Sequence, residues 1–263
     1  IPFSAASVLA GLACLAFFGA PSARADGSFE SGTPPGYRLE RGEQVLKLGP
    51  GQRVLVRNDF GDVRARFGGY AGDLEILAVV QQFANEGPRL DVQTHAEGET
   101  LVVDTGYADA EGTRVTRKTS GHRRRADLVL LVPENSPLEV VTSHGLIQLR
   151  GLHSDVSARS ESGEIQIRSI SGNVDVATGS GEILAAMPAQ KRDQVQRIRT
   201  GTGDLRLILA EDGSFRVTAT GDGLISTEFS LQFDTDDAGD RQAHALVGEG
   251  QTPIAVHAGS GHL

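Results

Sequence analysis

The sequence has 263 residues, a formal net charge of −9, 33 glycines and no tryptophan, and only 5% of its residues are aromatic. This composition argues against a helical core built on Leu, Met and aromatic side chains, and the glycines follow no three-residue period of the collagen type. The hydrophobic fraction of 39% is too high for a disordered chain, and the acidic balance argues against general nucleic-acid binding, so an all-β protein is the expectation.

The first feature along the chain is an apolar run over residues 5–20, followed by Ala23 and Ala25 at A-x-A spacing. A run of this kind before such a site is typical of a secretory signal peptide, so we predict a signal peptide over residues 1–25. An uncleaved membrane anchor is the alternative, although a span needs about 20 apolar residues. Because the sequence begins at Ile1 without methionine, we also expect residues to precede it.

The single cysteine, Cys14, lies inside this segment. Lipid attachment to its thiol is an alternative, but Gly11 stands where a bulky aliphatic residue is expected and apolar residues follow the cysteine. After cleavage at Ala25 the chain has no cysteine, so we expect neither a disulfide nor a cysteine-based zinc site. We also expect no transmembrane helix in the mature chain, and a location in the periplasm, on the outer surface or outside the cell.

The rest of the chain is predicted to contain one domain. We expect a flexible N-terminal segment over residues 26–45 and a single β-repeat domain over residues 46–263. Residues 54–65 predict an outlying rung, residues 73–132 contain longer strands, and residues 138–263 contain regular repeats. Since an open end of a repeat array exposes unpaired backbone, we expect the longer strands to cap or broaden the array.

A basic cluster interrupts the longer-strand region. Its members are Arg114, Arg117, Lys118, Arg123, Arg124 and Arg125. In an acidic chain such a cluster predicts a patch for an anionic ligand, such as lipopolysaccharide phosphates, anionic lipid or acidic polysaccharide, because guanidinium groups bind phosphate in a bidentate manner. A solvated loop between two strands is the alternative interpretation.

From residue 138 onward the sequence repeats. Each unit has a short segment of alternating apolar residues, typical of a strand with one buried face, and then a tight turn that ends in glycine. The aligned glycines are separated by 18, 18, 22, 20 and 38 residues, which indicates a unit of about 20 residues. They are Gly145, Gly163, Gly181, Gly203, Gly223 and Gly261, and Gly61 and Gly172 occupy similar turns in the outlying rung and in a half-repeat.

Two arrangements fit this repeat. Stacking the units coil on coil gives a parallel β-solenoid with a continuous interior, and folding the strands up and down gives an antiparallel sandwich. The near-constant period and the recurring Ser or Thr before the turn glycine favour the solenoid. We therefore predict an all-β, β-solenoid-like or β-helix-like array of short strands, with about 20 residues per repeat and an N-terminal β elaboration.

Together these features resemble the adhesin-like family of bacterial exported β-strand-repeat proteins, a domain of unknown function. The resemblance rests on residues 54–68, on residues 129–133 with residues 138–142, and on the Ser-Gly-Glu-Ile, Ser-Gly-Asn-Val and Thr-Gly-Asp-Leu units that follow. It covers roughly residues 40–263. It implies a β-solenoid-like domain of the envelope or the cell exterior and supplies no catalytic residues.

Candidate chemistry is sparse. The acidic stretch over residues 234–240 is similar to a calcium loop, but Ala238 and Ala245 occupy ligand positions, so a flexible acidic loop is favoured. The Ser-Gly pairs recur at repeat turns and form no nucleophile elbow, and no two histidines have metal-ligand spacing. Glu161 and Glu164 are candidate acid and base groups for a polysaccharide-acting enzyme, but a chain with no tryptophan and three tyrosines is poorly suited to stack on sugars.

We therefore expect a non-catalytic, exported scaffold or adhesion module with no cofactor or metal. Its expected partners are envelope or host glycans or other envelope proteins, and not nucleic acid. The alternatives are a polysaccharide-acting enzyme on a β-helix and a self-assembling envelope filament. An enzyme is expected to have a deep groove with clustered carboxylates or arginines, whereas a scaffold is expected to have flat faces with ladders of Ser, Thr and Asp.

Overall fold

The computed structural model describes residues 36–69, 72–83, 89–108, 114–115, 124–235 and 241–263. All described residues belong to one compact unit, which lies within residues 33–263. The predicted signal peptide and Cys14 therefore lie outside the described residues. In the described part of the chain, no helix has the length and apolarity that crossing a membrane requires.

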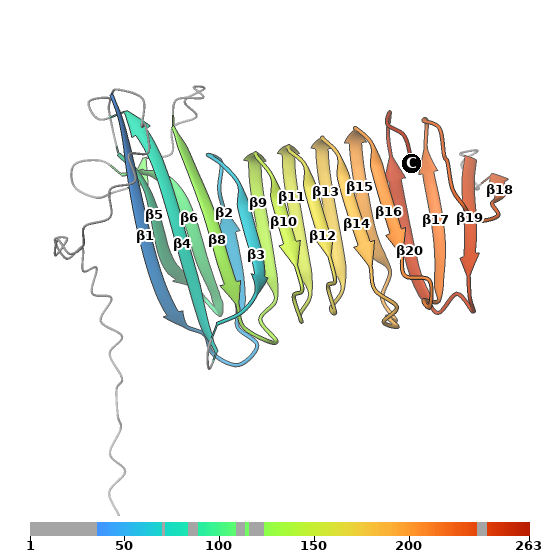
Figure 1. Ribbon diagram of the computed structural model, residues 1–263, viewed down its shortest axis with the longest axis horizontal. Helices are drawn as coiled ribbons and strands as arrows, with labels where there is room; N and C mark the ends of the chain where they lie inside the picture. The colour runs from blue at the N-terminus through green and yellow to red at the C-terminus, as the bar shows by residue number, and fades with distance from the viewer. Residues whose placement is uncertain (1–35, 70–71, 84–88, 109–113, 116–123, 236–240) are drawn as a thin grey trace, which may run out of the picture. The chain divides into compact units, whose positions relative to one another are not determined.

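The strands form two sheets (Figure 1). Sheet A has eight strands in the order β1-β4-β8-β3-β10-β12-β14-β16. Its strands are β1 (Tyr37–Lys47), β3 (Val63–Phe67), β4 (Asp73–Phe83), β8 (Arg125–Val132), β10 (Ile147–Arg150), β12 (Ile165–Arg168), β14 (Ile183–Met187) and β16 (Leu205–Leu209).

Sheet B has twelve strands, in the order β18-β19-β17-β20-β15-β13-β11-β9-β2-β6-β5 with β7 also paired to β6. Its strands are β2 (Arg53–Arg57), β5 (Arg89–Glu97), β6 (Thr100–Ala108), β7 (Arg114–Val115), β9 (Leu138–His144), β11 (Val156–Ser162), β13 (Val174–Ser180), β15 (Gln196–Thr202), β17 (Phe215–Gly221), β18 (Gln232–Thr235), β19 (Arg241–Val247) and β20 (Thr252–Ala258).

Each regular repeat forms one rung, with one strand in each sheet. The rungs β9–β10, β11–β12, β13–β14 and β15–β16 succeed one another, and their strands pair in parallel with their equivalents. Parallel pairing between equivalent strands is what coil-on-coil stacking produces. The predicted all-β, β-solenoid-like fold is therefore confirmed.

The core lies between the two sheets and follows from the period-two alternation of the strands. In sheet A, Ile147, Ile165 and Ile183 occupy matching positions on neighbouring strands and are no more than 1% exposed. In sheet B, Val140 and Val176 hold the equivalent inward positions and are fully buried. Burying one such side chain contributes about 1.5–3 kcal/mol, so the stack of rungs is the main source of stability.

The order of the rungs in space departs from the order in the sequence, which corrects the simple stacking in chain order. Strand β20 lies between β15 and β17 and pairs in parallel with both, so the turn of Gly261 lies between those of Gly203 and Gly223. The last glycine separation therefore contains an outward step through β18 and β19 and a return to an inner rung. Backbone hydrogen bonding requires only that the donors and acceptors along the edges of two strands match. The order of the strands in the sequence therefore does not fix the order of the rungs in space.

The outlying rung is displaced in the same way. Strands β2 and β3 form it, and they lie between β9–β10 on one side and the pair β6 and β8 on the other. Beyond β6 and β8 the pairing becomes antiparallel, with β5 on β6, β4 on β8 and β1 on β4. The longer strands of residues 73–132 thus lie at this end of both sheets.

The predicted flexible segment over residues 26–45 is wrong for its second half. Residues 37–47 form β1, which pairs with β4 over eleven positions from Tyr37–Phe83 to Lys47–Asp73. Most β1 side chains are exposed or half-buried, because β1 is the edge strand of sheet A. Apolar residues alternate only weakly in this segment, so the sequence does not predict a strand there. The strand depends on backbone pairing with β4.

The predicted turn glycines form a column along the rungs. A Cβ atom added to any one of them would overlap backbone atoms of the neighbouring rung, which for most members is the carbonyl oxygen of the next glycine. Gly145 and Gly203 also have φ angles of 107° and 134°, a region that other residues rarely adopt. The column contains Gly61, Gly145, Gly163, Gly181, Gly203, Gly261 and Gly223 in spatial order, and Gly172 makes the same approach to Ser154 in another turn.

A buried ladder of hydroxyl groups follows the glycine column on the sheet B side. Its members are at most 7% exposed and lie in register on neighbouring strands: Thr142, Ser160, Thr178 and Thr200. The hydroxyl of Thr178 donates to the carbonyl of Gly163 at 3.0 Å, and that of Thr200 donates to the carbonyl of Gly181 at 3.0 Å. Thr178 and Thr200 therefore satisfy turn carbonyls, whereas the hydroxyl of Thr142 donates to that of Ser160 at 3.2 Å.

A buried arginine joins the longer repeat between Gly181 and Gly203 to the neighbouring turn. Arg192 is 5% exposed and donates to the carbonyl of Gly172 at 2.9 Å and to that of Ile170. Burial lowers the pKa of Arg192 from its usual value. The insertion thus places a cationic group over the carbonyls of the turn below.

Candidate functional site

The outer face of sheet A carries three rows of side chains that run across the strands. The carboxylate row is Glu164, Glu182 and Asp204, each of which directly precedes its strand. The glutamine pair, Gln148 and Gln166, lies two residues further along β10 and β12. The arginine row, two residues further again, is Arg66, Arg150 and Arg168, which are paired by register on β3, β10 and β12.

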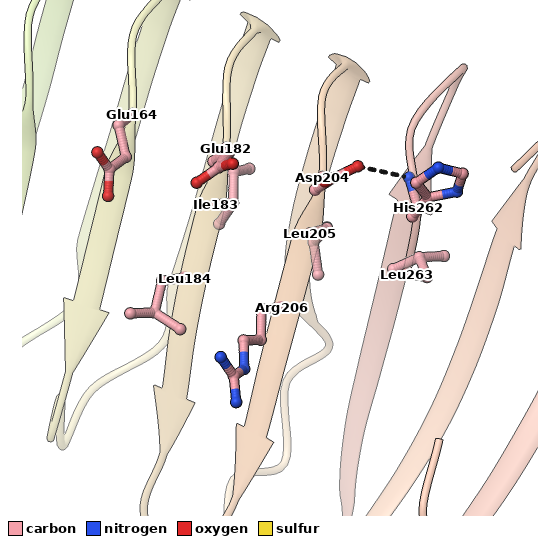
Figure 2. Close-up of a pocket in the computed structure, with 9 residues that line it drawn as sticks. All are labelled: Glu164, Glu182, Ile183, Leu184, Asp204, Leu205, Arg206, His262 and Leu263. Atoms are coloured by element: carbon pink, nitrogen blue, oxygen red, sulfur yellow. Dashed lines mark hydrogen bonds between the residues drawn. The ribbon is translucent and has the colours of Figure 1, made fainter. Parts of the chain in front are cut away.

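The carboxylate row borders an open depression of about 370 Å³ (Figure 2). Figure 2 shows Glu164, Glu182 and Asp204 beside one another, with Arg206 further along β16. The backbone N–H of His262 donates to Asp204 at 3.0 Å, which ties the end of the chain to this rung. The depression therefore joins three carboxylates at equivalent repeat positions with one guanidinium.

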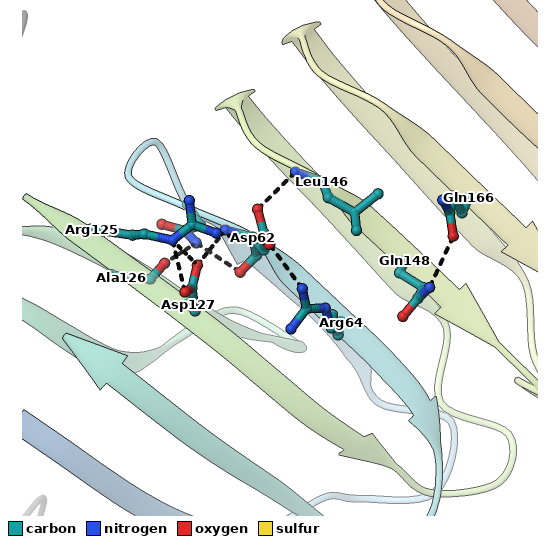
Figure 3. A network of polar contacts seen from close by, with 9 residues as sticks. Asp62, Arg64, Arg125, Ala126, Asp127, Leu146, Gln148 and Gln166 are labelled. Carbon is teal, nitrogen blue, oxygen red and sulfur yellow. Dashed lines mark hydrogen bonds and ion pairs between the residues drawn. The ribbon is translucent and has the colours of Figure 1, made fainter. Parts of the chain in front are cut away.

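A network of polar contacts lies where β3 begins, between β8 and β10 (Figure 3). Asp62 accepts from the backbone N–H of Leu146 at 3.0 Å and forms ion pairs with Arg64 at 3.0 Å and Arg125 at 2.9 Å. Asp127 accepts from the backbone N–H of Asp62 at 2.9 Å. Asp62 occupies the repeat position of the carboxylate row, but here its charge is balanced by two arginines.

Arg125 is held between two carboxylates. Its guanidinium contacts Asp127 at 2.8 Å and Asp62 at 2.9 Å. The hydrogen bonds to Asp127 and the nearby negative charges raise the pKa of Arg125 above its usual value. Its first role in this structure is therefore to join β8 to β3.

The predicted basic cluster is only partly described. Arg125 opens β8 and Arg124 precedes it, and Arg114 lies in the short strand β7 that pairs with β6. The remaining members, Arg117, Lys118 and Arg123, lie outside the described residues. The anionic-ligand patch stays a prediction, and the engagement of Arg125 with Asp62 and Asp127 reduces the charge that this member offers.

The other sequence candidates are not brought together. Glu161 is the second-last residue of β11 in sheet B, whereas Glu164 directly precedes β12 in sheet A. The two residues are therefore associated with different sheets. Of the calcium-like stretch, residues 236–240 lie outside the described residues. In the part of the chain that the structure describes, no three histidine, cysteine or acidic side chains are grouped as a metal site.

The turn histidines contact neighbouring rungs. The Nδ1 atom of His144 lies 2.8 Å from the hydroxyl of Ser162, its partner in register. His153 stacks on Phe67, with ring centroids 4.3 Å apart. Both histidine side chains are exposed.

Sequence reasoning missed the arginine row and the carboxylate row. Each acidic member follows its column glycine directly, and each arginine lies five residues after Gly61, Gly145 or Gly163. The position of each residue relative to its turn glycine could therefore have indicated both rows. That residues at equivalent repeat positions form a row on the surface is known only when the register of the strands is known.

The outer face of sheet B differs, because its charges are paired across strands. Arg159 contacts Glu139 at 3.0 Å and Asp175 at 3.4 Å, and Arg199 contacts Asp175 at 3.1 Å. Opposite charges therefore alternate across β9, β11, β13 and β15. Such exposed pairs contribute little stability each.

The family model for Toastrack DUF4097 matches residues 52–263. The chain belongs to the Toastrack family. The match begins at β2 and spans every regular rung of the array. The Toastrack domain is β-solenoid-like and of unknown function, in agreement with the fold described above.

One solved structure that is similar to this chain is distant from it in sequence. The crystal structure of a "putative cell adhesion protein" from Clostridium sporogenes covers 86% of this chain and 97% of its own, with 13% identity and a TM-score of 0.47. No curated protein matches the sequence of this chain.

Proposed function

We propose that this Toastrack protein is a non-catalytic, exported module of the cell envelope or cell exterior that binds its partners on the flat outer faces of the solenoid. The observation that carries the proposal is the repetition of surface chemistry in register. Acidic side chains occupy one outer position on three successive rungs, and arginines occupy another on three. Repeated groups of this kind suit multivalent binding, in which several weak contacts act together.

Export is supported by the sequence. The apolar run over residues 5–20 and the A-x-A site that ends at Ala25 are typical of a secreted protein. Expression of the chain in a bacterium, followed by fractionation and mass measurement, tests this part. We expect a mature form that begins at Asp26 outside the cytoplasm, and an uncleaved cytoplasmic form would contradict it.

Binding is tested by applying the mature protein to a glycan array at two salt concentrations. We expect retention of one or more glycans, and weaker retention of charged glycans at high salt because exposed charges are screened. A protein that binds no glycan and recovers no envelope protein from outer-surface extracts would contradict the proposed function.

A second candidate function is polysaccharide cleavage, which the three carboxylates beside the depression favour. Carboxylate pairs serve as acid and base or nucleophile in glycoside hydrolysis. The lining of the depression includes Ile183, Leu184 and Leu205 but no Trp, Tyr or Phe side chain that would stack on a sugar ring. Release of reducing ends from acidic or neutral polysaccharides, abolished by Glu182→Gln, would favour the enzyme over the binding module.

A further inference from the structure

The arginine row brings three guanidinium groups together on one exposed face. Arg66, Arg150 and Arg168 are all exposed and lie opposite one another on β3, β10 and β12. Adjacent strands are about 4.8 Å apart, so the row presents one positive charge per rung. Like charges directly opposite each other on a sheet destabilise it, so the row is not explained by folding.

The arginines of the row lack the ion pairs that several other arginines of this chain form. Arg64 is paired with Asp62, and Arg159 and Arg199 are paired with carboxylates of sheet B. Within the described part of the chain, no side chain forms an ion pair or hydrogen bond with the guanidinium groups of the arginine row. Their donors are therefore available to a ligand.

We propose that the arginine row binds a linear polyuronate, with carboxylates of the polymer at the guanidinium groups of the row. Guanidinium groups form bidentate hydrogen bonds with carboxylates, which gives each contact both strength and direction. A sugar unit in an extended chain is close in length to the separation between rungs. Successive units of such a chain are rotated about its axis, so carboxylates on the side of the polymer that faces the sheet meet guanidinium groups of the row. This inference rests on the proposed binding function and adds a ligand class and a site to it.

The glutamine pair lies along the same path and supplies neutral hydrogen-bonding groups. The side-chain amide of Gln148 donates to that of Gln166 at 2.9 Å, which holds both in a fixed orientation beside Arg150 and Arg168. Amide groups donate to and accept from hydroxyls. The surface therefore offers guanidinium groups for carboxylates and, two residues away along each strand, amides for sugar hydroxyls.

The carboxylate row distinguishes a polymer from a membrane surface. Glu164 and Arg168 lie on the same face of sheet A, four residues apart, which is roughly 13 Å along a strand. An extended polymer that follows the arginine row passes the carboxylate row at that distance. A flat anionic bilayer covering the face would meet both rows and be repelled by the acidic one.

The test compares two triple variants of the mature protein by titration calorimetry with polygalacturonate at low salt. The first variant carries Arg66→Gln, Arg150→Gln and Arg168→Gln. The matched control carries Arg53→Gln, Arg197→Gln and Arg216→Gln, which removes the same charge from exposed positions of sheet B. We expect the row variant to bind at least about tenfold more weakly than the native protein, and the control to bind within about twofold, because hydrogen bonds to charged groups exceed the long-range effect of net charge.

Three outcomes would overturn the inference. These are no binding of polygalacturonate by the native protein, equal weakening in both variants, and binding of phosphatidylglycerol vesicles or polyphosphate in place of the polyuronate. Thermal unfolding of each variant verifies that it is folded, and Arg→Lys at the three row positions provides a second variant that keeps the charge but loses bidentate geometry. If the array identifies another glycan while polygalacturonate fails, the proposed function stands and this inference does not.

Discussion

A Cβ atom on Gly203 would overlap the carbonyl oxygen of Gly181 on the neighbouring rung. The same relationship links Gly181 to Gly163 and Gly163 to Gly145. The separation of the strands sets this distance, so the turns cannot move apart without breaking the parallel pairing on either side. Glycine at this position is thus a condition for stacking one rung on the next.

Gly203→Ala is therefore expected to destabilise the domain by at least about 2 kcal/mol, since it adds both a clash and a residue with unfavourable φ. Urea unfolding followed by circular dichroism measures the change. Gly42→Ala is the matched control, because nothing lies within 4 Å of a Cβ at that edge-strand position. Equal stability of the two variants would refute the role of the column.

The hydroxyl ladder yields a second prediction. Thr200→Val keeps the shape of the side chain but removes the hydrogen bond to the carbonyl of Gly181, and we expect a loss of about 1–2 kcal/mol because that carbonyl loses a partner. Thr202→Val, at an exposed position of the same strand, is expected to change the free energy of unfolding by less than about 0.5 kcal/mol. Indistinguishable losses would show that the ladder does not stabilise the turn.

The carboxylate row predicts a stabilising substitution. Glu182 lies between Glu164 and Asp204 on adjacent rungs, and like charges at such positions repel. Glu182→Gln is expected to stabilise the protein by roughly 0.5 kcal/mol at low salt, and the gain is expected to fade at high salt. Glu211→Gln, in an exposed turn, serves as the control, and a gain that persists at high salt would contradict the electrostatic explanation.

A pH effect is expected at the β5 edge of sheet B. Glu97 accepts hydrogen bonds from His95 at 3.0 Å and Arg57 at 3.4 Å, and these contacts lower the pKa of Glu97 below its usual 4.5. Because the folded-state pKa is the lower one, the stabilising contribution is present above pH 4.5 and is lost as the pH falls through the folded-state value.

The corresponding variant is His95→Gln, which removes the contact with the largest effect. We expect the pKa of Glu97, measured from the NMR shift of its carboxyl carbon, to rise toward 4.5. His257→Gln, a histidine on β20, is expected to leave it unchanged. A Glu97 titration that is the same in all three proteins would exclude this network as the cause.

Much of the repeating fold is predictable because its signals are local. The glycine period, the alternation in segments such as Ile165–Arg168 and the Ser or Thr before each turn are all visible in single repeats. They predict short strands, an apolar interior and parallel stacking. Strand β1 is the exception, since residues 37–47 contain little apolar alternation and depend on β4 for their pairing.

The candidate site was less predictable. The sequence predicts a ligand-binding patch at the basic cluster of residues 114–125, because its charged residues are close together in the chain. The arginine row consists of single arginines in three repeats, and Arg66 becomes a neighbour of Arg150 only because β3 pairs with β10. Charge patches formed by register are invisible to a search for charge runs.

The sequence by itself therefore determines what each rung is made of: two strands, an inward apolar face and a glycine turn. The tertiary structure alone decides which rungs are neighbours, as when β20 enters between β15 and β17 and β2 enters between β6 and β9. The physical reason is that every rung presents a similar edge of backbone donors and acceptors. Pairing between such edges is selected by side-chain packing and chain connection over the whole array, and no single segment encodes it.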